Sequence, residues 1–154
     1  MIPLALPSLE TIQVLVPGRL LRHVVTFTVP GPPVPKQRPQ VTERGTYYPA
    51  RTRGSTRLSY PEYKELVQGC FCQAMAEEWF DIRFHHLGQW LLWVVAAANR
   101  GDFDNVAGSV ADALQGLLWR NDSQIHEAHQ TLIRKVKTAE QGILVAVWEL
   151  EERV

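Results

Sequence analysis

The sequence predicts an α+β domain in which a four-stranded mixed sheet carries two packed helices, in the order β-α-β-α-β-β. Three observations predict it: short apolar segments typical of strands, two longer segments with apolar residues at helical spacing, and the alternation of the two kinds along the chain. A length of 154 residues with 45% hydrophobic content suits one domain with its own core.

Four segments have the patterns of strands. In the first, Val25, Phe27 and Val29 alternate with polar residues, and a Pro-Gly-Pro-Pro run then ends the pattern. The second is almost continuously apolar from Trp90 to Val95, which is typical of a central strand buried on both faces. The predicted strands cover residues 23–29, 89–98, 124–137 and 142–150.

Two segments predict amphipathic helices. Ser59 and Glu62 form a capping box, with Pro61 in the first turn, and this helix is expected to run to about Trp79. Its predicted apolar stripe is Tyr63, Leu66, Val67, Cys70, Ala74 and Met75. The second helix is expected over about 105–117, with Val106, Val110, Ala113, Leu114 and Leu117 facing inward.

The remaining segments are predicted to be irregular. Residues 1–20 contain three prolines and are expected to form an irregular leader, to which no function is assigned, ahead of a single domain over 21–152. Residues 30–58 are rich in Arg, Pro, Gly and Thr and predict a long basic loop. Loops of this length inside a compact domain are usually functional or disordered.

Positive charge is concentrated in one part of a chain whose formal net charge is zero. Between Arg19 and Arg57 there are eight Lys and Arg residues and one acid, Glu43. This asymmetry predicts a basic surface for a polyanion, with Tyr47 and Tyr48 as possible stacking groups. The alternative is a solvated, flexible loop.

The cysteines and the apolar segments indicate a cytoplasmic protein. Cys70 and Cys72 are the only cysteines, and at a spacing of two in a helix they make a poor disulfide or metal pair, so core packing is expected for both. No secretory signal is evident at the start, and no apolar run is long enough to span a membrane.

Two carboxylates stand where the central strand gives way to the second helix. Asp102 and Asp104 are two positions apart, so in extended chain they point the same way, and Asp122 follows the helix. Three oxygen donors suit a hard ion such as Mg²⁺ or Mn²⁺. An acidic metal site beside a basic segment and a helix N-terminus fits phosphodiester cleavage. The alternative is that Asp102 and Asp104 only cap the helix and form a turn.

Four blocks of the chain together resemble the RusA family of Holliday junction resolvases. They are residues 30–39 (PGPPVPKQRP), 101–106 (GDFDNV), 112–114 (DAL) and 119–125 (WRNDSQI), and the resemblance covers about residues 22–150. It implies a homodimer, often prophage-encoded, that binds four-way DNA junctions during recombination and repair. It also implies two symmetric nicks made with Mg²⁺ or Mn²⁺, with Asp102, Asp104 and Asp122 as the catalytic acids and metal ligands.

One position departs from the family pattern, which places a catalytically important lysine four residues after the second aspartate. This chain has Gly108 there, so we hypothesise that Lys36 of the basic loop takes the catalytic role. Ordinary phosphate contact or solvent exposure is the alternative for Lys36 and Arg38. The departure favours the alternative of a catalytically weakened junction-binding protein. A third alternative is a nuclease that acts more broadly on branched DNA. The residues predicted to bind DNA are Lys36, Arg38, Arg44, Arg51, Arg53, Arg57 and Arg100.

Other polar residues near these blocks are given structural explanations. Glu127 is expected to be a solvent-facing strand residue rather than a ligand, and His126 and His129 to lie on opposite faces of a strand. Asp112 is expected to contribute polarity at the helix surface or at an interface. The tryptophans are expected mainly in the core or in a dimer interface, with DNA contact as the alternative for Trp119.

Overall fold

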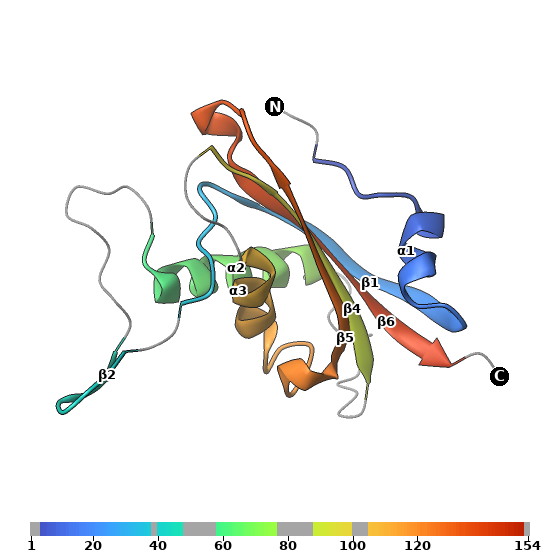
Figure 1. Ribbon diagram of the computed structural model, residues 1–154, viewed down its shortest axis with the longest axis horizontal. Helices are drawn as coiled ribbons and strands as arrows, with labels where there is room; N and C mark the ends of the chain where they lie inside the picture. Colours follow the sequence, from blue (N-terminus) through green and yellow to red (C-terminus); the bar gives the residue numbers. More distant parts are fainter. Residues whose placement is uncertain (1–3, 38–39, 48–57, 77–87, 100–104, 153–154) are drawn as a thin grey trace.

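The structure is a computed structural model that describes residues 4–37, 40–47, 58–76, 88–99 and 105–152. Its centre is a four-stranded mixed sheet in the order β1-β6-β4-β5 (Figure 1). The strands are β1 (Arg19–Pro30), β4 (Gln89–Ala97), β5 (Ile125–Ile133) and β6 (Gly142–Glu152). Strand β6 pairs antiparallel with β1 and β4, and β4 pairs parallel with β5. The predicted α+β class is therefore confirmed.

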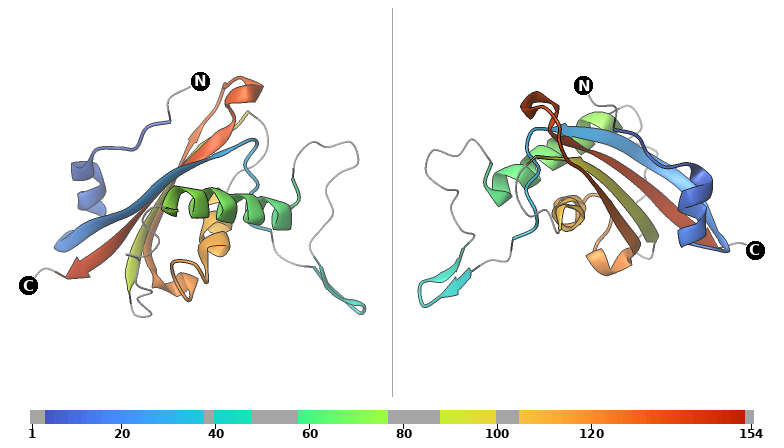
Figure 2. Two further views of the ribbon diagram at one scale, coloured as in Figure 1. Left: turned by 180° about the vertical axis from the view of Figure 1, so that it is seen from behind. Right: turned by 45° about the horizontal axis from the view of Figure 1, so that its top comes forward.

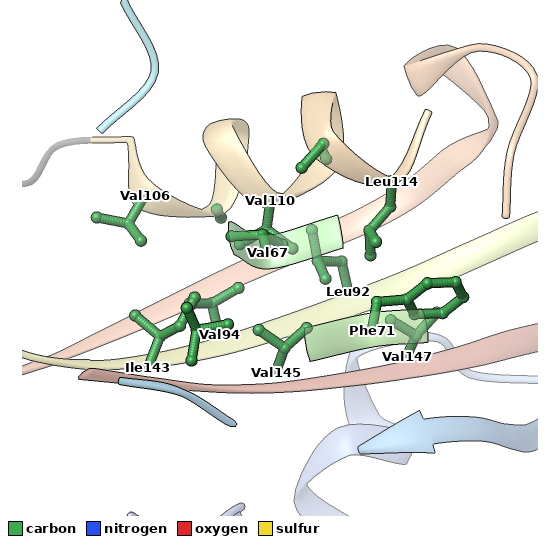
Figure 3. Close-up of a cluster of buried hydrophobic side chains, with 14 of the residues drawn as sticks. Val67, Phe71, Leu92, Val94, Val106, Val110, Leu114, Ile143, Val145 and Val147 are labelled. Carbon is green, nitrogen blue, oxygen red and sulfur yellow. The ribbon is translucent and has the colours of Figure 1, made fainter. Parts of the chain in front are cut away.

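Two helices cover one face of this sheet, as the periodicity predicts. They are α2 (Tyr60–Met75) and α3 (Val106–Leu114), and both views of Figure 2 place them on the same side. Figure 3 shows Val67 and Phe71 of α2 and Val110 of α3 directed at the strands. The cluster is closed by Trp119, which packs edge-on against Trp90 with ring centroids 6.0 Å apart. Burying each large apolar side chain here contributes roughly 1.5–3 kcal/mol.

Strand β4 lies between β6 and β5 and is buried on both faces, as its apolar run predicts. Alternate residues such as Leu92 and Val94 face α2 and α3, whereas Leu91 and Trp93 belong to a second apolar cluster on the opposite face. Because a central strand has no edge exposed to solvent, its end is a rigid support for whatever follows it.

The helix start predicted at Ser59 is confirmed, but part of the predicted apolar stripe is wrong. Ser59 and Glu62 form the capping box with Pro61 in the first turn, and within the described residues α2 ends at Met75. Phe71 is fully buried, whereas Ala74 is exposed. The core-facing positions are Tyr60, Tyr63, Val67, Phe71 and Met75, and the last step is one of four residues, so Met75 rather than Ala74 is buried.

The prediction that residues 1–20 are irregular is wrong from Leu9 onward. Helix α1 (Leu9–Leu15) begins at Ser8, whose side chain accepts a hydrogen bond from the Thr11 backbone N–H, and β1 already starts at Arg19. Ile12 and Val16, four residues apart, are both buried in the apolar cluster on the second sheet face. Figure 2 shows α1 on the side of the sheet opposite α2 and α3.

The predicted basic loop contains a short hairpin that the sequence pattern did not reveal. Strand β2 (Gln40–Thr42) pairs antiparallel with β3 (Gly45–Tyr47), and Gly45 adopts a positive φ of 123° at the turn. A side chain is strained at such a φ, so glycine permits the turn. In Figures 1 and 2 the hairpin projects away from the sheet.

Two other boundaries end earlier than predicted. Helix α3 stops at Leu114 because the chain turns at Gly116, which has a positive φ of 89°, and Leu117 is only partly buried. Strand β5 stops at Ile133, two residues before Lys135, whose φ is 61°. Both residues have left-handed backbone conformations, which regular helices and strands do not contain.

The two cysteines of α2 differ in exposure, so core packing is wrong for one of them. Cys70 is partly buried and packs against the main core, and burial raises the pKa of its thiol. Cys72 is exposed. A residue two positions along a helix points to a different side, which explains the difference.

Candidate nucleic-acid and metal site

The end of β4 is fixed by the side chain of Asn99. Its amide nitrogen donates to the Val136 carbonyl, and its amide oxygen accepts from the Val136 N–H at 2.7 Å. The neighbouring Ala98 N–H donates to the Ile133 carbonyl at 3.0 Å. Asn99, the last described residue before the aspartate motif, is therefore held by its side chain, and Ala98 before it by the backbone.

The start of α3, on the other side of the motif, is held by two side-chain caps. The Asn105 side-chain oxygen accepts from the Gly108 N–H at 2.8 Å, and that of Gln130 on β5 accepts from the Ala107 N–H at 2.8 Å. These bonds satisfy two of the four amide groups that a helix leaves unpaired at its start. The caps tie α3 to the middle of strand β5.

The beginning of the basic loop is docked at the same place. Val34 is buried in the main core, and the Lys36 N–H donates to the Asn105 carbonyl at 2.9 Å. The Lys36 side chain is exposed. The structure therefore brings one predicted site residue, Lys36, next to the residue that follows Asp104 in the chain.

Several predicted site residues lie outside the described residues. They are Asp102, Asp104, Arg38, Arg51, Arg53, Arg57 and Arg100. Of the predicted DNA-binding arginines, the structure describes Arg44, which is exposed at the turn of the β2–β3 hairpin.

Asp122 is described and stands in a short 3-10 helix, η2 (Asp122–Gln124), which leads into β5. The Asn121 side chain caps this helix, and the Gln124 side-chain oxygen accepts from the Arg120 and Asn121 N–H groups at 2.8 and 3.0 Å. The Asp122 carboxylate is exposed and makes no ion pair with another described residue. It is thus fixed by its backbone and open to a ligand.

Asp122 and Asn105 lie at opposite ends of α3. The helix has nine residues, so its axis is about 13 Å long. Parallel pairing sets Ile125 opposite Trp90 at the beginning of β4, whereas Gln130, which caps the start of α3, lies opposite Val94. In Figure 1, η2 and the start of α3 are accordingly well separated. Within the described residues, no three potential metal-ligating side chains lie together.

Asp112 connects α3 to α2, in agreement with its prediction as helix-surface polarity. Its carboxylate accepts from the Tyr60 hydroxyl at 2.5 Å and pairs with the Lys64 ammonium at 3.1 Å. Partial burial acts to raise the pKa of Asp112, but the bonds from Tyr60 and Lys64 and the charges of Lys64 and Lys36 outweigh it and lower this pKa.

The other polar candidates have structural roles. Glu127 pairs with His129 at 3.3 Å, and the His129 ring stacks on Trp93 with centroids 5.0 Å apart. His126 is exposed, and its separation of three along β5 agrees with the predicted opposite face. DNA contact by Trp119 is ruled out in this fold, because the ring is fully buried and its N–H donates to the Ala111 carbonyl. Its core prediction is confirmed.

Sequence patterns did not identify Asn99, Gln130 and Lys64. Gln130 carries a usable signal, since it is a polar residue on the strand face that otherwise packs against helices. Asn99 and Lys64 carry no comparable signal, because their partners are 37 and 48 positions away in the sequence.

A comparison with protein families identifies the chain. The model described as "Endodeoxyribonuclease RusA" matches residues 30–148, most of the chain. The chain belongs to the RusA family. Membership supports a nuclease that acts on Holliday junctions. The matched RusA region includes Lys36, the aspartate motif and Asp122, and it begins after α1 and most of β1. No curated protein was found to match the sequence.

The RusA match also covers Gly108, whose surroundings are specific. A Cβ atom added there would lie 2.2 Å from the side-chain oxygen of Asn105, which caps the same residue. Any other side chain therefore requires Asn105 to move.

Among the helices that the structure describes, none is long and apolar enough to cross a bilayer.

Proposed function

We propose that this protein is a Mg²⁺- or Mn²⁺-dependent endonuclease that resolves four-way DNA junctions by paired nicks in recombination and repair. The observation that carries the proposal is the RusA match, which includes all three candidate aspartates. Two further features support it: Asn99 and Asn105 are fixed on either side of the aspartate motif, and Lys36 is docked beside Asn105.

The metal ligands in this proposal are Asp102, Asp104 and Asp122. The exposed Asp122 carboxylate, with no ion pair to another described residue, fits a hard divalent ion. A divalent ion bound by these carboxylates would polarise the scissile phosphodiester and the attacking water. The Lys36 backbone is bonded to Asn105, the residue after Asp104, so its side chain would contact the phosphate or stabilise its developing charge.

The active unit is a homodimer, in which two copies combine their ligands. Asp122 follows the far end of α3, whose axis is about 13 Å long, whereas Asp104 precedes its start, and one aspartate side chain does not span that length. A two-fold axis can set the Asp122 end of one copy against the α3 start of the other, and it creates two equivalent sites. Two such sites suit a junction that offers two equivalent strands.

A junction-binding protein that has lost turnover is the second candidate. It is favoured by Gly108, where the family pattern has a lysine and where the Asn105 amide now occupies the space that a side chain would need. In this candidate the basic surface binds branched DNA, but charge that develops at the phosphate is not stabilised.

A labelled four-way junction, incubated with the protein with and without Mg²⁺, separates the two candidates. Symmetric paired nicks that require the metal support the resolvase. A mobility shift without nicks supports the binder, and equal cleavage of linear duplex or fork DNA indicates a nuclease with broader specificity. Chelation by EDTA should abolish nicking but leave the shift.

A further inference from the structure

One surface of α3 carries an ion pair that the proposed chemistry does not use. Gly108 and Asp112 are four residues apart and therefore lie on the same face of α3. On this face the Asp112 carboxylate accepts from the Tyr60 hydroxyl at 2.5 Å and pairs with the Lys64 ammonium at 3.1 Å. The ammonium also lies 5.4 Å from the centre of the Tyr60 ring. Lys64 thus has a defined position.

A second lysine reaches the same surface from the basic loop. The Lys36 backbone is bonded to Asn105 at the start of α3, and the charge of Lys36 acts on the Asp112 carboxyl. Two ammonium groups and one carboxylate leave a net charge of about one positive unit. The positive end of the α3 dipole adds to it. Gly108, one turn before Asp112 on this face, contributes no side chain.

We propose that Lys36 and Lys64 together bind one backbone phosphate of the DNA beside Gly108, and that Asp112 and Tyr60 hold Lys64 in place for this contact. The inference rests on the proposed function, since it takes the polyanion to be branched DNA. Lysine binds phosphate as a point charge on a flexible stem, so a carboxylate that fixes one stem reduces the entropy lost on binding. Asp112 is therefore a positioning residue.

The test measures the salt dependence of junction binding without metal, so that cleavage does not enter the readout. Replacing Lys64 by Met keeps the stem and removes the charge. We expect Lys64→Met to lower the slope of log K against log salt by up to about 0.9, the value for one phosphate contact in duplex DNA, because Lys36 still contacts the shared phosphate. Lys137→Met is the matched control: Lys137 is exposed just before the 3-10 helix η3 (Thr138–Glu140), and its slope should be unchanged.

A rescue variant separates the loss of a phosphate contact from a general loss of structure. A lysine at position 108 would stand one turn from Asp112 on the same face, so Lys64→Met/Gly108→Lys should regain the lost slope. Because any side chain at 108 displaces Asn105, Lys64→Met/Gly108→Ala is the control and should not regain it. If Lys64→Met fails to fold, Lys36→Met replaces it in the test. The Lys36 side chain is exposed, and removing its charge should lower the slope by the same amount.

The outcomes for this pair and for the enzyme are distinguishable. A folded Lys64→Met protein with the wild-type slope overturns the inference, whether or not the wild type nicks DNA. If Lys64→Met lowers the slope but the wild-type protein never nicks DNA, the phosphate contact is supported and the resolvase is rejected. A slope that also falls in Lys137→Met shows a general charge effect and overturns the inference.

Discussion

The two ends of α3 are built in different ways. Its start is held by polar side chains: Asn105 and Gln130 cap it, and Lys36 is bonded to it by the backbone. Its far end is held by the core, because Trp119 is fully buried against Trp90 and bonded to Ala111. Polar caps allow charged groups to stay near solvent, whereas a buried indole fixes the backbone without placing charge.

This difference suggests that the two ends have different functions. The start of α3 brings together a helix N-terminus and Lys36, and Asp112 holds Lys64 further along the same helix, which suits an anionic phosphate. The far end presents one exposed carboxylate, Asp122, on a rigid turn. A metal-dependent nuclease needs a metal-binding carboxylate and phosphate-binding basic groups in one site. Because these groups lie at different ends of α3, the proposed dimer would bring the groups of two copies together.

Removal of one carboxylate should have the largest effect. We expect Asp104→Asn to lower the nicking rate of a four-way junction at least about a thousandfold, since metal stabilisation is worth several kcal/mol. Junction affinity should persist or rise, because a negative charge near the phosphate is removed. Single-turnover nicking and mobility shifts measure the two effects. Loss of both in a folded variant would contradict the assignment of Asp104 as a ligand.

Mixing two inactive variants tests whether the ends of α3 combine between copies. If each site uses Asp104 of one copy and Asp122 of the other, a dimer of Asp104→Asn with Asp122→Asn keeps one intact site. Random exchange of subunits makes about half of the dimers mixed, and each mixed dimer has one intact site out of two. Nicking should therefore return to about a quarter of the wild-type rate. If all ligands come from one chain, no combination is intact, and the mixture stays inactive.

Removal of a cap compares the two ends directly. Asn105→Ala removes the bond to Gly108 and should cost about 1 kcal/mol in the free energy of unfolding, as N-cap losses do. The matched control is Asn121→Ala, which removes the corresponding bond to Ser123 at η2. Urea unfolding measures the stability of both variants. The Lys36 N–H donates to the Asn105 backbone carbonyl, which the alanine keeps but which the lost cap no longer fixes, so we expect only Asn105→Ala to weaken junction binding as well. Equal binding by both variants would show that the start of α3 does not position Lys36.

Much of this fold could be predicted from local patterns. Ser59, Pro61 and Glu62 fixed the start of α2 correctly, and the apolar run at Trp90 to Val95 identified the central strand, because these signals depend on neighbouring residues. Helix α1 was missed, since three prolines near the start outweighed the short apolar spacing of Ile12 and Val16. The β2–β3 hairpin was missed because its strands have only three residues each.

The residue types of the candidate site remain a prediction from the sequence, and the geometry around them could not be predicted. The spacing of the aspartates predicted a metal site, and the basic segment predicted a surface for DNA. The separation of Asp122 from Asn105 depends on the direction of β5 relative to β4, which residue patterns do not encode. The cap from Gln130 and the ion pair of Lys64 with Asp112 are likewise contacts between distant segments.

The smallest expected effect concerns the pH dependence of stability near Asp112. Its pKa is lowered below the usual 3.8, so the ionised carboxylate stabilises the folded state above pH 4, and this contribution is lost as the pH falls through the lowered value. Asp112→Asn should therefore be less stable than wild type at pH 6, with the difference shrinking below about pH 4. Urea unfolding at several pH values measures it.

The matched control is Asp122→Asn, which alters a carboxylate that has no ion pair with another described residue. A stability difference for Asp112→Asn that stays constant from pH 6 to pH 3 would show that the packing of the side chain at position 112, and not its charge, stabilises the contact between α2 and α3. In that case Lys64 would not be held by the Asp112 charge, and Lys36 would be the lysine that gives the start of α3 its positive charge.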